Sequence, residues 1–132
     1  MRATATCRTA APVLLIEDEP SVTAFLRAAL ERRGYSVVPV SSGAEGLERL
    51  SCGKYRGVIS DIRMPGPVNG AEVRAWVERN RPELSARVIL ISGDTANSET
   101  QALLDNSGTP CIEKPFRVKH FLAVVEKTFG AP

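Results

Sequence analysis

Ionisable and hydroxyl side chains follow four apolar segments of this chain, at the point where each segment ends. They are Glu17, Asp18, Asp61, Ser92 and Lys114. If the segments are parallel strands of one open sheet, their carboxyl ends meet at one crevice and bring three carboxylates, a hydroxyl and an ammonium together. Because carboxylates repel one another, the cluster needs a positive partner. The simplest arrangement is a hard divalent cation bound by carboxylates, with one carboxylate left as a nucleophile.

Alternating strands and helices must position this cluster. The strands are predicted at residues 13–16, 35–40, 57–60, 87–91 and 110–113, and the helices at 20–33, after 43, from about 70, at 97–106 and at 117–129. Pro20 suits the first position of a helix, and Gly34 suits the position after its end. The strands are near-continuous Val, Ile and Leu runs, which is typical of strands covered by helices on both faces. Five strand–helix units predict an α/β fold with a doubly wound parallel sheet.

Each helix is expected to bury one apolar face at helical spacing. The inward residues are predicted to be Val22, Phe25, Leu26, Ala29 and Leu30 in the first helix, Ala44, Leu47 and Leu50 in the second, Val73, Trp76 and Val77 in the third, and Val118, Phe121, Leu122 and Val125 in the last. The helix at 97–106 has few apolar residues and is expected to be the least stable. His120 lies off the apolar face of the last helix and is expected at the surface.

The composition is that of one globular domain with a short tail. The 132 residues fit a single domain, predicted at 13–129 after a flexible N-terminal tail at 1–12. The net charge of +2 comes from scattered basic residues and argues against nucleic acid binding. No apolar run is long enough to span a bilayer. Cys7, Cys52 and Cys111 have no metal-ligand or redox spacing, so we interpret them as free thiols in a reducing cytoplasm.

Ordinary structural roles compete with this chemical interpretation. Asp18 or Glu19 could cap the first turn of the helix at 20–33. A cap explains one acid but leaves Glu17 unexplained. Asp61 could start the turn that comes after it, which is a common use of aspartate. Lys114 precedes a proline and would usually be solvated, so its place after the last strand is the feature that favours a role at the crevice.

Four motifs at the strand ends resemble the response-regulator receiver domain, the phosphoacceptor module of bacterial two-component signalling. They are LIEDEP at 15–20, SDIRMPG at 60–66, ISG at 91–93 and EKPF at 113–116. The resemblance covers about residues 13–129. It implies a flavodoxin-like doubly wound five-stranded parallel sheet of order 2-1-3-4-5, with helices on both faces.

The resemblance also implies a role for each site residue. Asp61 matches the phosphoacceptor and Asp18 a direct Mg²⁺ ligand, while Glu17 matches the second acidic position, which often acts through water. Arg63 is expected to offer its backbone carbonyl to Mg²⁺. The switch hydroxyl and the cation that pairs with the aspartate or its phosphoryl oxygens are matched by Ser92 and Lys114. Gly93 is expected to leave the acceptor open to a donor.

The function implied is a signalling switch in a phosphorelay or two-component system. A histidine kinase or histidine phosphotransfer protein would phosphorylate Asp61 in a Mg²⁺-dependent reaction. His120 is the only histidine, so the donor must be another molecule. Self-phosphorylation from a phosphodonor and slow autodephosphorylation are the only activities expected. The resemblance also allows a dimer that forms on phosphorylation, with no membrane contact and no direct nucleic acid binding by this chain.

Two departures from the family pattern affect these expectations. The loop at 64–70 is one residue longer than usual, which, together with ISGD at 91–94, is similar to receivers attached to hybrid histidine kinases. Cys111 stands where the family often has an aromatic switch residue, so signalling is expected to move the segment after Ser92 instead. Arg63 and Asp94 are expected to face each other across the mouth of the site.

Two other functions remain as alternatives. One is a small phosphatase or phosphotransferase with an aspartate nucleophile, although Arg63 stands where such enzymes typically have a second acid. The other is an interaction module that is not phosphorylated, which the presence of all the site residues disfavours.

Overall fold

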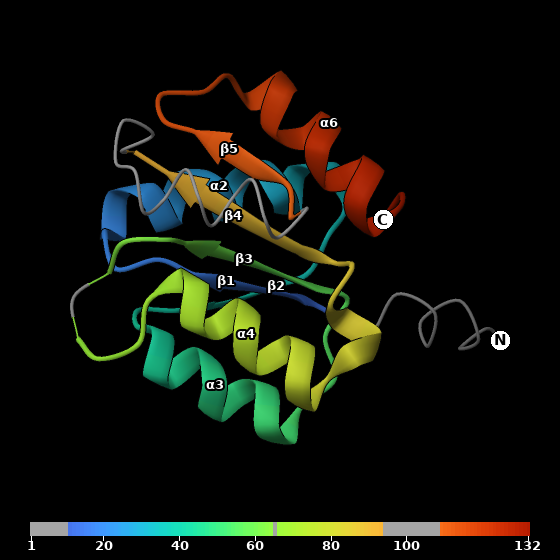
Figure 1. Cartoon of the computed structure of the whole chain (residues 1–132). Helices are drawn as coiled ribbons and strands as arrows, with labels where there is room; N and C mark the ends of the chain where they lie inside the picture. Colours follow the sequence, from blue (N-terminus) through green and yellow to red (C-terminus); the bar gives the residue numbers. More distant parts are fainter. Residues whose placement is uncertain (1–10, 65, 94–108) are drawn as a thin grey trace, which may run out of the picture.

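The centre of the computed structural model is a five-stranded parallel sheet in the order β2-β1-β3-β4-β5 (Figure 1). The structure describes residues 11–64, 66–93 and 109–132. Its strands are β1 (Val13–Ile16), β2 (Val37–Val40), β3 (Gly57–Asp61), β4 (Val88–Ser92) and β5 (Cys111–Glu113). The predicted fold class and strand order 2-1-3-4-5 are confirmed.

Helices cover both faces of the sheet. On one face lie α2 (Pro20–Arg33) and α6 (Val118–Phe129), and on the other lie α3 (Gly43–Cys52) and α4 (Gly70–Asn80) (Figure 1). Side chains alternate along β1, so Val13 and Leu15 join the core beneath α2 and α6, while Leu14 and Ile16 join the core beneath α3 and α4. The strands β1, β3 and β4 are buried along their whole length.

Local sequence sets the ends of the helices. Pro20 is the first residue of α2, as predicted, and Gly34 follows its end with a φ of 114°, a left-handed conformation that glycine adopts without strain. The hydroxyl of Ser42 caps α3. Asn69 and Glu72 form a capping box at the start of α4, which was not predicted. Both caps fix helix starts next to the loop after β3, because α4 follows this loop and the first residue of α3 contacts it at Val68.

Several predicted boundaries need correction. β2 begins at Val37 rather than at residue 35, because the N–H of Tyr35 still donates to the carbonyl of Leu30 at the end of α2. β5 begins at Cys111, and α6 begins at Val118. The 3₁₀ turn at Pro82–Leu84 was not predicted. Asp61 and Ser92 are the last residues of β3 and β4 instead of following them, so both are buried.

Two residues predicted to face inward are exposed. Phe25 is 47% exposed, because Leu26 and Leu30 define the buried line of α2 and Phe25 lies one position off it. Ala44 is exposed because α3 packs through its glycines. At Gly46, a Cβ atom would lie 2.4 Å from Ile16 Cδ1, so the helix approaches the sheet on its glycine side. His120 is exposed, as predicted.

Some predictions concern residues outside the described ranges. They are most of the tail at 1–12, the helix at 97–106 and the Arg63–Asp94 pair. Among the described residues, no helix has the length and apolar character needed to cross a membrane.

Candidate functional site

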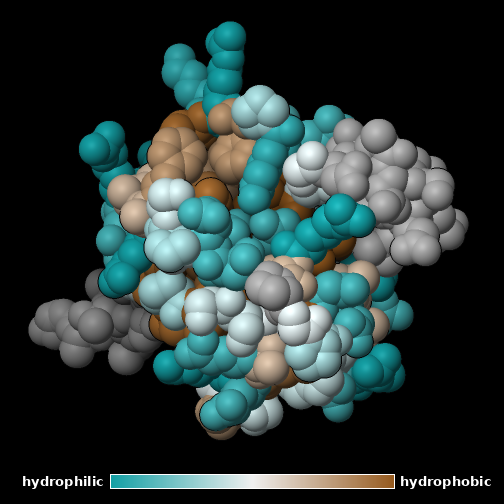
Figure 2. Space-filling model, turned by 90° about the vertical axis from the view of Figure 1, so that its left-hand side faces the viewer, coloured by the Kyte–Doolittle hydropathy of each residue, from teal (hydrophilic) through white to brown (hydrophobic). Residues whose placement is uncertain are grey.

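The carboxyl ends of the strands gather the predicted site residues at one edge of the sheet. Asp61 and Ser92 end the neighbouring strands β3 and β4, while Glu17 follows β1 directly and Lys114 follows β5. Figure 2 looks onto this edge, where hydrophilic residues occupy the centre of the face and apolar residues gather above them. The predicted convergence of carboxylates, hydroxyl and ammonium at one edge is the arrangement that the strand order produces.

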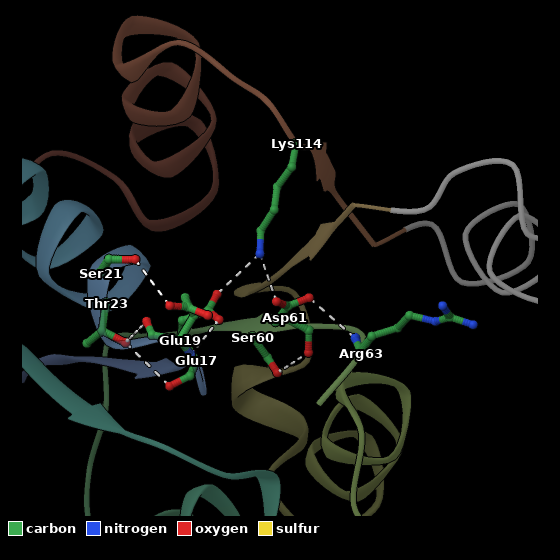
Figure 3. Close-up of polar contacts among 8 residues, drawn as sticks. All are labelled: Glu17, Glu19, Ser21, Thr23, Ser60, Asp61, Arg63 and Lys114. Carbon is green, nitrogen blue, oxygen red and sulfur yellow. Dashed lines mark hydrogen bonds and ion pairs between the residues drawn. The ribbon is translucent and has the colours of Figure 1, made fainter. Parts of the chain in front are cut away.

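Asp61 is held by hydrogen bonds from both sides of its carboxylate (Figure 3). The ammonium of Lys114 donates to Oδ2 at 2.9 Å, and the backbone N–H of Arg63 donates to Oδ1 at 3.3 Å. The hydroxyl of Ser60 donates to the Asp61 carbonyl at 2.9 Å. Only 7% of Asp61 is exposed. These contacts orient the carboxylate and leave it a narrow contact with solvent.

Lys114 joins the two buried carboxylates. Its Nζ lies 2.9 Å from Asp61 Oδ2 and 3.6 Å from Glu17 Oε1. Burial lowers the pKa of Lys114, but the hydrogen bond to Asp61 and the negative charges of Asp61 and Glu17 outweigh burial, so its pKa lies above the ordinary value. Lys114 is therefore charged at neutral pH and offsets part of the negative charge of the site.

Glu17 is the most buried carboxylate of the site, with 2% exposed. The backbone N–H of Glu19 donates to Glu17 Oε2 at 3.1 Å, whereas Oε1 is buried and accepts no hydrogen bond within the described part of the chain. Burial raises the pKa of Glu17 above its ordinary value, and the charges of Asp61 and Asp18 act in the same direction. The Glu19 N–H and the Lys114 ammonium lower the pKa without cancelling this effect.

The acidic residues fit a divalent cation. Carboxylate oxygens of Glu17, Asp18 and Asp61 lie within 4.8 Å of one another, with Asp18 exposed and the other two buried. Hard cations such as Mg²⁺ take oxygen ligands and keep several waters, which suits a cluster with one exposed member. Glu17 Oε1 accepts no hydrogen bond in the described part of the chain, and Lys114 Nζ, 3.6 Å away, offsets only part of the charge of three carboxylates. We therefore find that the donor set matches Mg²⁺.

Arg63 and Ser92 lie beside the acceptor in different ways. The side chain of Arg63 is exposed and points away from the carboxylates (Figure 3). Ser92 is buried, and its carbonyl accepts the N–H of Lys114 at 2.7 Å, which ties β4 to the segment bearing the lysine. At Gly93, a Cβ atom would contact Lys114 Cδ at an ordinary 3.7 Å, so the structure gives no steric requirement for glycine there.

Of the ordinary structural roles considered for the acidic residues, helix capping is absent and turn formation by Asp61 is present. Glu19 occupies the N-cap position of α2, but no side-chain hydrogen bond caps this helix. Capping therefore does not account for the acidic residues after β1. The Asp61 carboxylate does accept the N–H two residues ahead, as an aspartate that starts a turn would. The turn contact uses one oxygen, and the other oxygen binds Lys114.

Several polar contacts that support the acidic residues were not predicted from the sequence. Besides the Glu19 N–H and the Ser60 hydroxyl, Thr23 in the first turn of α2 donates to the carbonyls of Glu17 and Glu19 at 3.3 and 3.1 Å. The sequence does mark Ser60 as unusual, because it places a hydroxyl within an apolar strand. It gives no indication of the Glu19 contact, since every residue except proline has a backbone N–H.

Comparisons with known proteins agree with this geometry. The family model described as the response regulator receiver domain matches residues 13–126. The transcriptional regulatory protein TcrA of Mycobacterium tuberculosis is 32% identical over 111 residues, covering 84% of this chain and 43% of TcrA. The chain thus spans less than half the length of this curated relative.

Two solved structures extend the comparison. The signal receiver domain of a signal transduction histidine kinase from Syntrophus aciditrophicus has a TM-score of 0.81 at 26% identity, covering 90% of this chain and 89% of that one. The response regulator TrrA from Thermotoga maritima, in complex with Mg²⁺ and BeF, has a TM-score of 0.77 at 27% identity, covering 89% of this chain and 98% of that one.

Proposed function

Because the chain belongs to the response regulator receiver domain family, we propose that Asp61 is its phosphoacceptor in a Mg²⁺-dependent signalling switch. One observation carries the proposal. The Asp61 carboxylate accepts a hydrogen bond from the Lys114 ammonium, 2.9 Å away, and lies within 4.8 Å of carboxylate oxygens of Glu17 and Asp18. This arrangement gives a nucleophile that has a fixed cation and a metal-binding cluster beside it.

The proposed reaction moves one phosphoryl group from a phosphohistidine or an acyl phosphate to Asp61. An oxygen lone pair of Asp61 forms the new O–P bond, while the bond from phosphorus to the donor atom breaks and its electron pair leaves with the donor. Phosphoryl transfer depends mostly on positioning and charge neutralisation. Lys114 and the Arg63 N–H orient the two Asp61 oxygens before the donor arrives.

We assign the binding of Mg²⁺ to four residues. Asp18 and Asp61 would contribute a carboxylate oxygen each, Arg63 would contribute its backbone carbonyl, and Glu17 would act through a bound water. Mg²⁺, when bound, supplies neutralising charge for the phosphoryl oxygens. The buried Oε1 of Glu17 supports this assignment, because it accepts no hydrogen bond in the described part of the chain and could accept one from a metal-bound water.

After transfer, Ser92 and Lys114 would bind the new phosphoryl oxygens. Ser92 ends the strand next to Asp61, and its hydroxyl would donate one hydrogen bond. Lys114 would exchange its contact with Asp61 Oδ2 for one with the phosphoryl group. Movement of Ser92 would then be passed to the segment after β4.

The donor is proposed to be a histidine kinase or histidine phosphotransfer protein in the cytoplasm. The sole histidine of these 132 residues, His120, is exposed on α6 and is not among the residues gathered at the carboxyl ends of the strands. A surface pocket of about 430 Å³ beside Lys114 is lined by Val22, Phe25 and Phe116, among others. We propose that this apolar pocket, with the exposed Phe25 at its side, receives the donor protein.

The two relatives point to different outputs. TcrA is a transcriptional regulatory protein, whereas the Syntrophus domain comes from a histidine kinase. The long loop after β3 favours association with a hybrid kinase, and phosphorylation-dependent dimerisation is part of the same proposal. Nucleic acid contact is assigned to none of the residues of this chain.

Incubation with acetyl phosphate, with Mg²⁺ or with EDTA, tests the proposed function by intact mass. The proposal predicts one labile phosphoryl group, formed only with Mg²⁺. Turnover of many phosphomonoesters would instead support the phosphatase alternative. No mass change under either condition would support the unphosphorylated interaction module.

A further inference from the structure

The loop after β3 connects the acceptor to the start of α4, and its two ends are fixed. The N–H of Ile62 donates to Ile91 of the neighbouring strand at 2.9 Å, and the N–H of Gly70 donates back to the Ile62 carbonyl at 2.9 Å. At Gly70, a Cβ atom would lie 2.5 Å from the Asp61 carbonyl oxygen. The start of α4 therefore rests against the backbone of the acceptor itself.

The same loop also rests on a second helix. At Gly43, the first residue of α3, a Cβ atom would lie 2.4 Å from the Val68 carbonyl oxygen and 2.8 Å from Val68 Cγ1. A backbone carbonyl cannot rotate away as a flexible side chain can, so the contact needs glycine at this position. Val68 is half-buried and packs on the core beneath α3 and α4. We call this contact between Val68 and Gly43 the loop seat.

The loop seat joins two rigid helix starts. Ser42 accepts the N–H of Glu45 at 3.2 Å and fixes the first turn of α3. The Asn69–Glu72 capping box fixes the first turn of α4, directly after Val68. Val68, at the far end of the loop, is thus held against α3, while Ile62, next to the acceptor, is held against β4.

From this geometry we infer that Val68, through its seat on Gly43, is a positioning residue for the Mg²⁺-binding segment Asp61–Arg63. Mg²⁺ requires near-ideal octahedral geometry at about 2.0–2.1 Å from each ligand, so a small shift of the Arg63 carbonyl weakens binding. The inference rests on the proposed function, because it needs Arg63 to be a metal ligand. It adds a residue that touches neither metal nor phosphoryl group.

Two variants disturb the loop seat in opposite ways. Val68→Ala removes contact without a clash, and Gly43→Ala pushes the loop away. Val38→Ala is the matched control, because Val38 is also a half-buried valine that packs on the same core, but it lies in β2. If Gly43→Ala does not fold, Val68→Ala alone carries the test.

The readouts are the free energy of unfolding, the Mg²⁺ dissociation constant and the amide chemical shift of Arg63 in EDTA. We expect Val68→Ala and Val38→Ala to lose comparable stability. Only the seat variants should weaken Mg²⁺ binding, by about tenfold as for other residues that support metal ligands, and shift the Arg63 amide without metal.

Mg²⁺ binding by the wild type distinguishes failure of this inference alone from failure of the proposed function. If the wild type binds Mg²⁺ and Val68→Ala binds it with the same dissociation constant as Val38→Ala, the loop seat has no positioning role, while the proposed function stands. Absence of Mg²⁺ binding by the wild type would overturn the proposed function and this inference together.

Discussion

In the metal-free protein, the ionised carboxylate of Glu17 lowers the stability of the folded state. Burial raises its pKa above the ordinary value of 4.5, so the folded state binds the proton more tightly than the unfolded chain does. The resulting stabilisation is fully present below that ordinary value and is lost as pH rises through the raised folded-state pKa. At neutral pH, ionised Glu17 therefore destabilises the protein unless a cation binds.

Replacement of Glu17 by glutamine should remove this pH dependence. In EDTA, Glu17→Gln is expected to melt above the wild type at neutral pH, and the difference should shrink toward acidic pH. Thermal unfolding across this pH range measures the effect. The exposed Glu48 provides the control variant Glu48→Gln, which should follow the wild-type curve. A difference that does not change with pH would contradict the burial argument.

Asp18 should control the response of stability to Mg²⁺. In the wild type, Mg²⁺ at about ten times its dissociation constant should add about 1.4 kcal/mol to the free energy of unfolding. Asp18→Ala should lose that gain while relieving repulsion in the metal-free protein. Thermal melts with Mg²⁺ and with EDTA test both effects, and an unchanged Mg²⁺ shift in the variant would count against the ligand assignment.

Cys111 occupies the position where the family often has an aromatic residue, and its thiol is poorly ionised. Burial raises its pKa to about 11, and the charge of Glu113 adds to this effect. Because the thiolate is the nucleophile, iodoacetamide at mildly alkaline pH should modify the exposed Cys52 at least about tenfold faster. Peptide mass mapping over time measures the two rates. Equal rates would show that Cys111 is more accessible than the structure places it.

At the residue scale, the sequence predicted which ionisable groups meet, because parallel strand ends converge. It did not predict how they are held. The Glu19 amide and the Arg63 amide are backbone donors without a side-chain signature. Asp61 and Ser92 also proved to be the last residues of their strands, since pairing in the sheet continues beyond the apolar run.

At the element scale, helices with clear terminal signals were predicted best. Pro20 and Gly34 bound α2 as expected. In α3, Leu47 and Leu50 pack on the core as predicted, but Ala44 was predicted wrongly, because glycine carries no hydropathy signal yet allows the closest approach to the sheet. The prediction that Phe25 is buried was wrong for the opposite reason. Its large apolar side chain suggested burial, but its position lies off the buried line of α2.

The segment after β4 should be the element that responds to phosphorylation. Ser92 ends β4 next to the acceptor, and Cys111 has no ring to move beside it. Hydrogen exchange with and without Mg²⁺ and beryllofluoride should therefore change most at residues 93–108, nearly all of which lie outside the described part of the chain. If α6 around Phe121 and Val125 changes most while that segment is silent, the proposed route is wrong.

At the scale of the whole molecule, the opposite edge of the sheet ties the last residues of the chain to the core. The hydroxyl of Tyr35 donates to the Gly130 carbonyl at 2.5 Å. The guanidinium of Arg56 donates to the carbonyls of Phe129, at 3.2 Å, and Ala131, and lies 5.2 Å from the Tyr35 ring centre. Tyr35 and Arg56 precede β2 and β3, so these contacts lie far from the acidic cluster.

Tyr35→Phe should therefore lower the stability of the protein without changing Mg²⁺ binding at the acidic cluster. Loss of one hydrogen bond is expected to reduce the free energy of unfolding by about 1 kcal/mol. Urea unfolding measures that loss, and the Mg²⁺ dissociation constant should stay at the wild-type value. A variant with normal stability and weakened Mg²⁺ binding would mean that the two edges of the sheet are coupled.

The most direct test of the central claim is the rate at which Asp61→Asn gains a phosphoryl group. Wild type, Asp61→Asn and Glu48→Gln are incubated with acetyl phosphate and Mg²⁺, and the intact mass is followed over time. Asparagine keeps the shape of the side chain but lacks the nucleophilic oxygen pair. We predict one phosphoryl group on the wild type and on Glu48→Gln, and none on Asp61→Asn. Phosphorylation of Asp61→Asn at the wild-type rate would contradict the assignment of Asp61 as the phosphoacceptor.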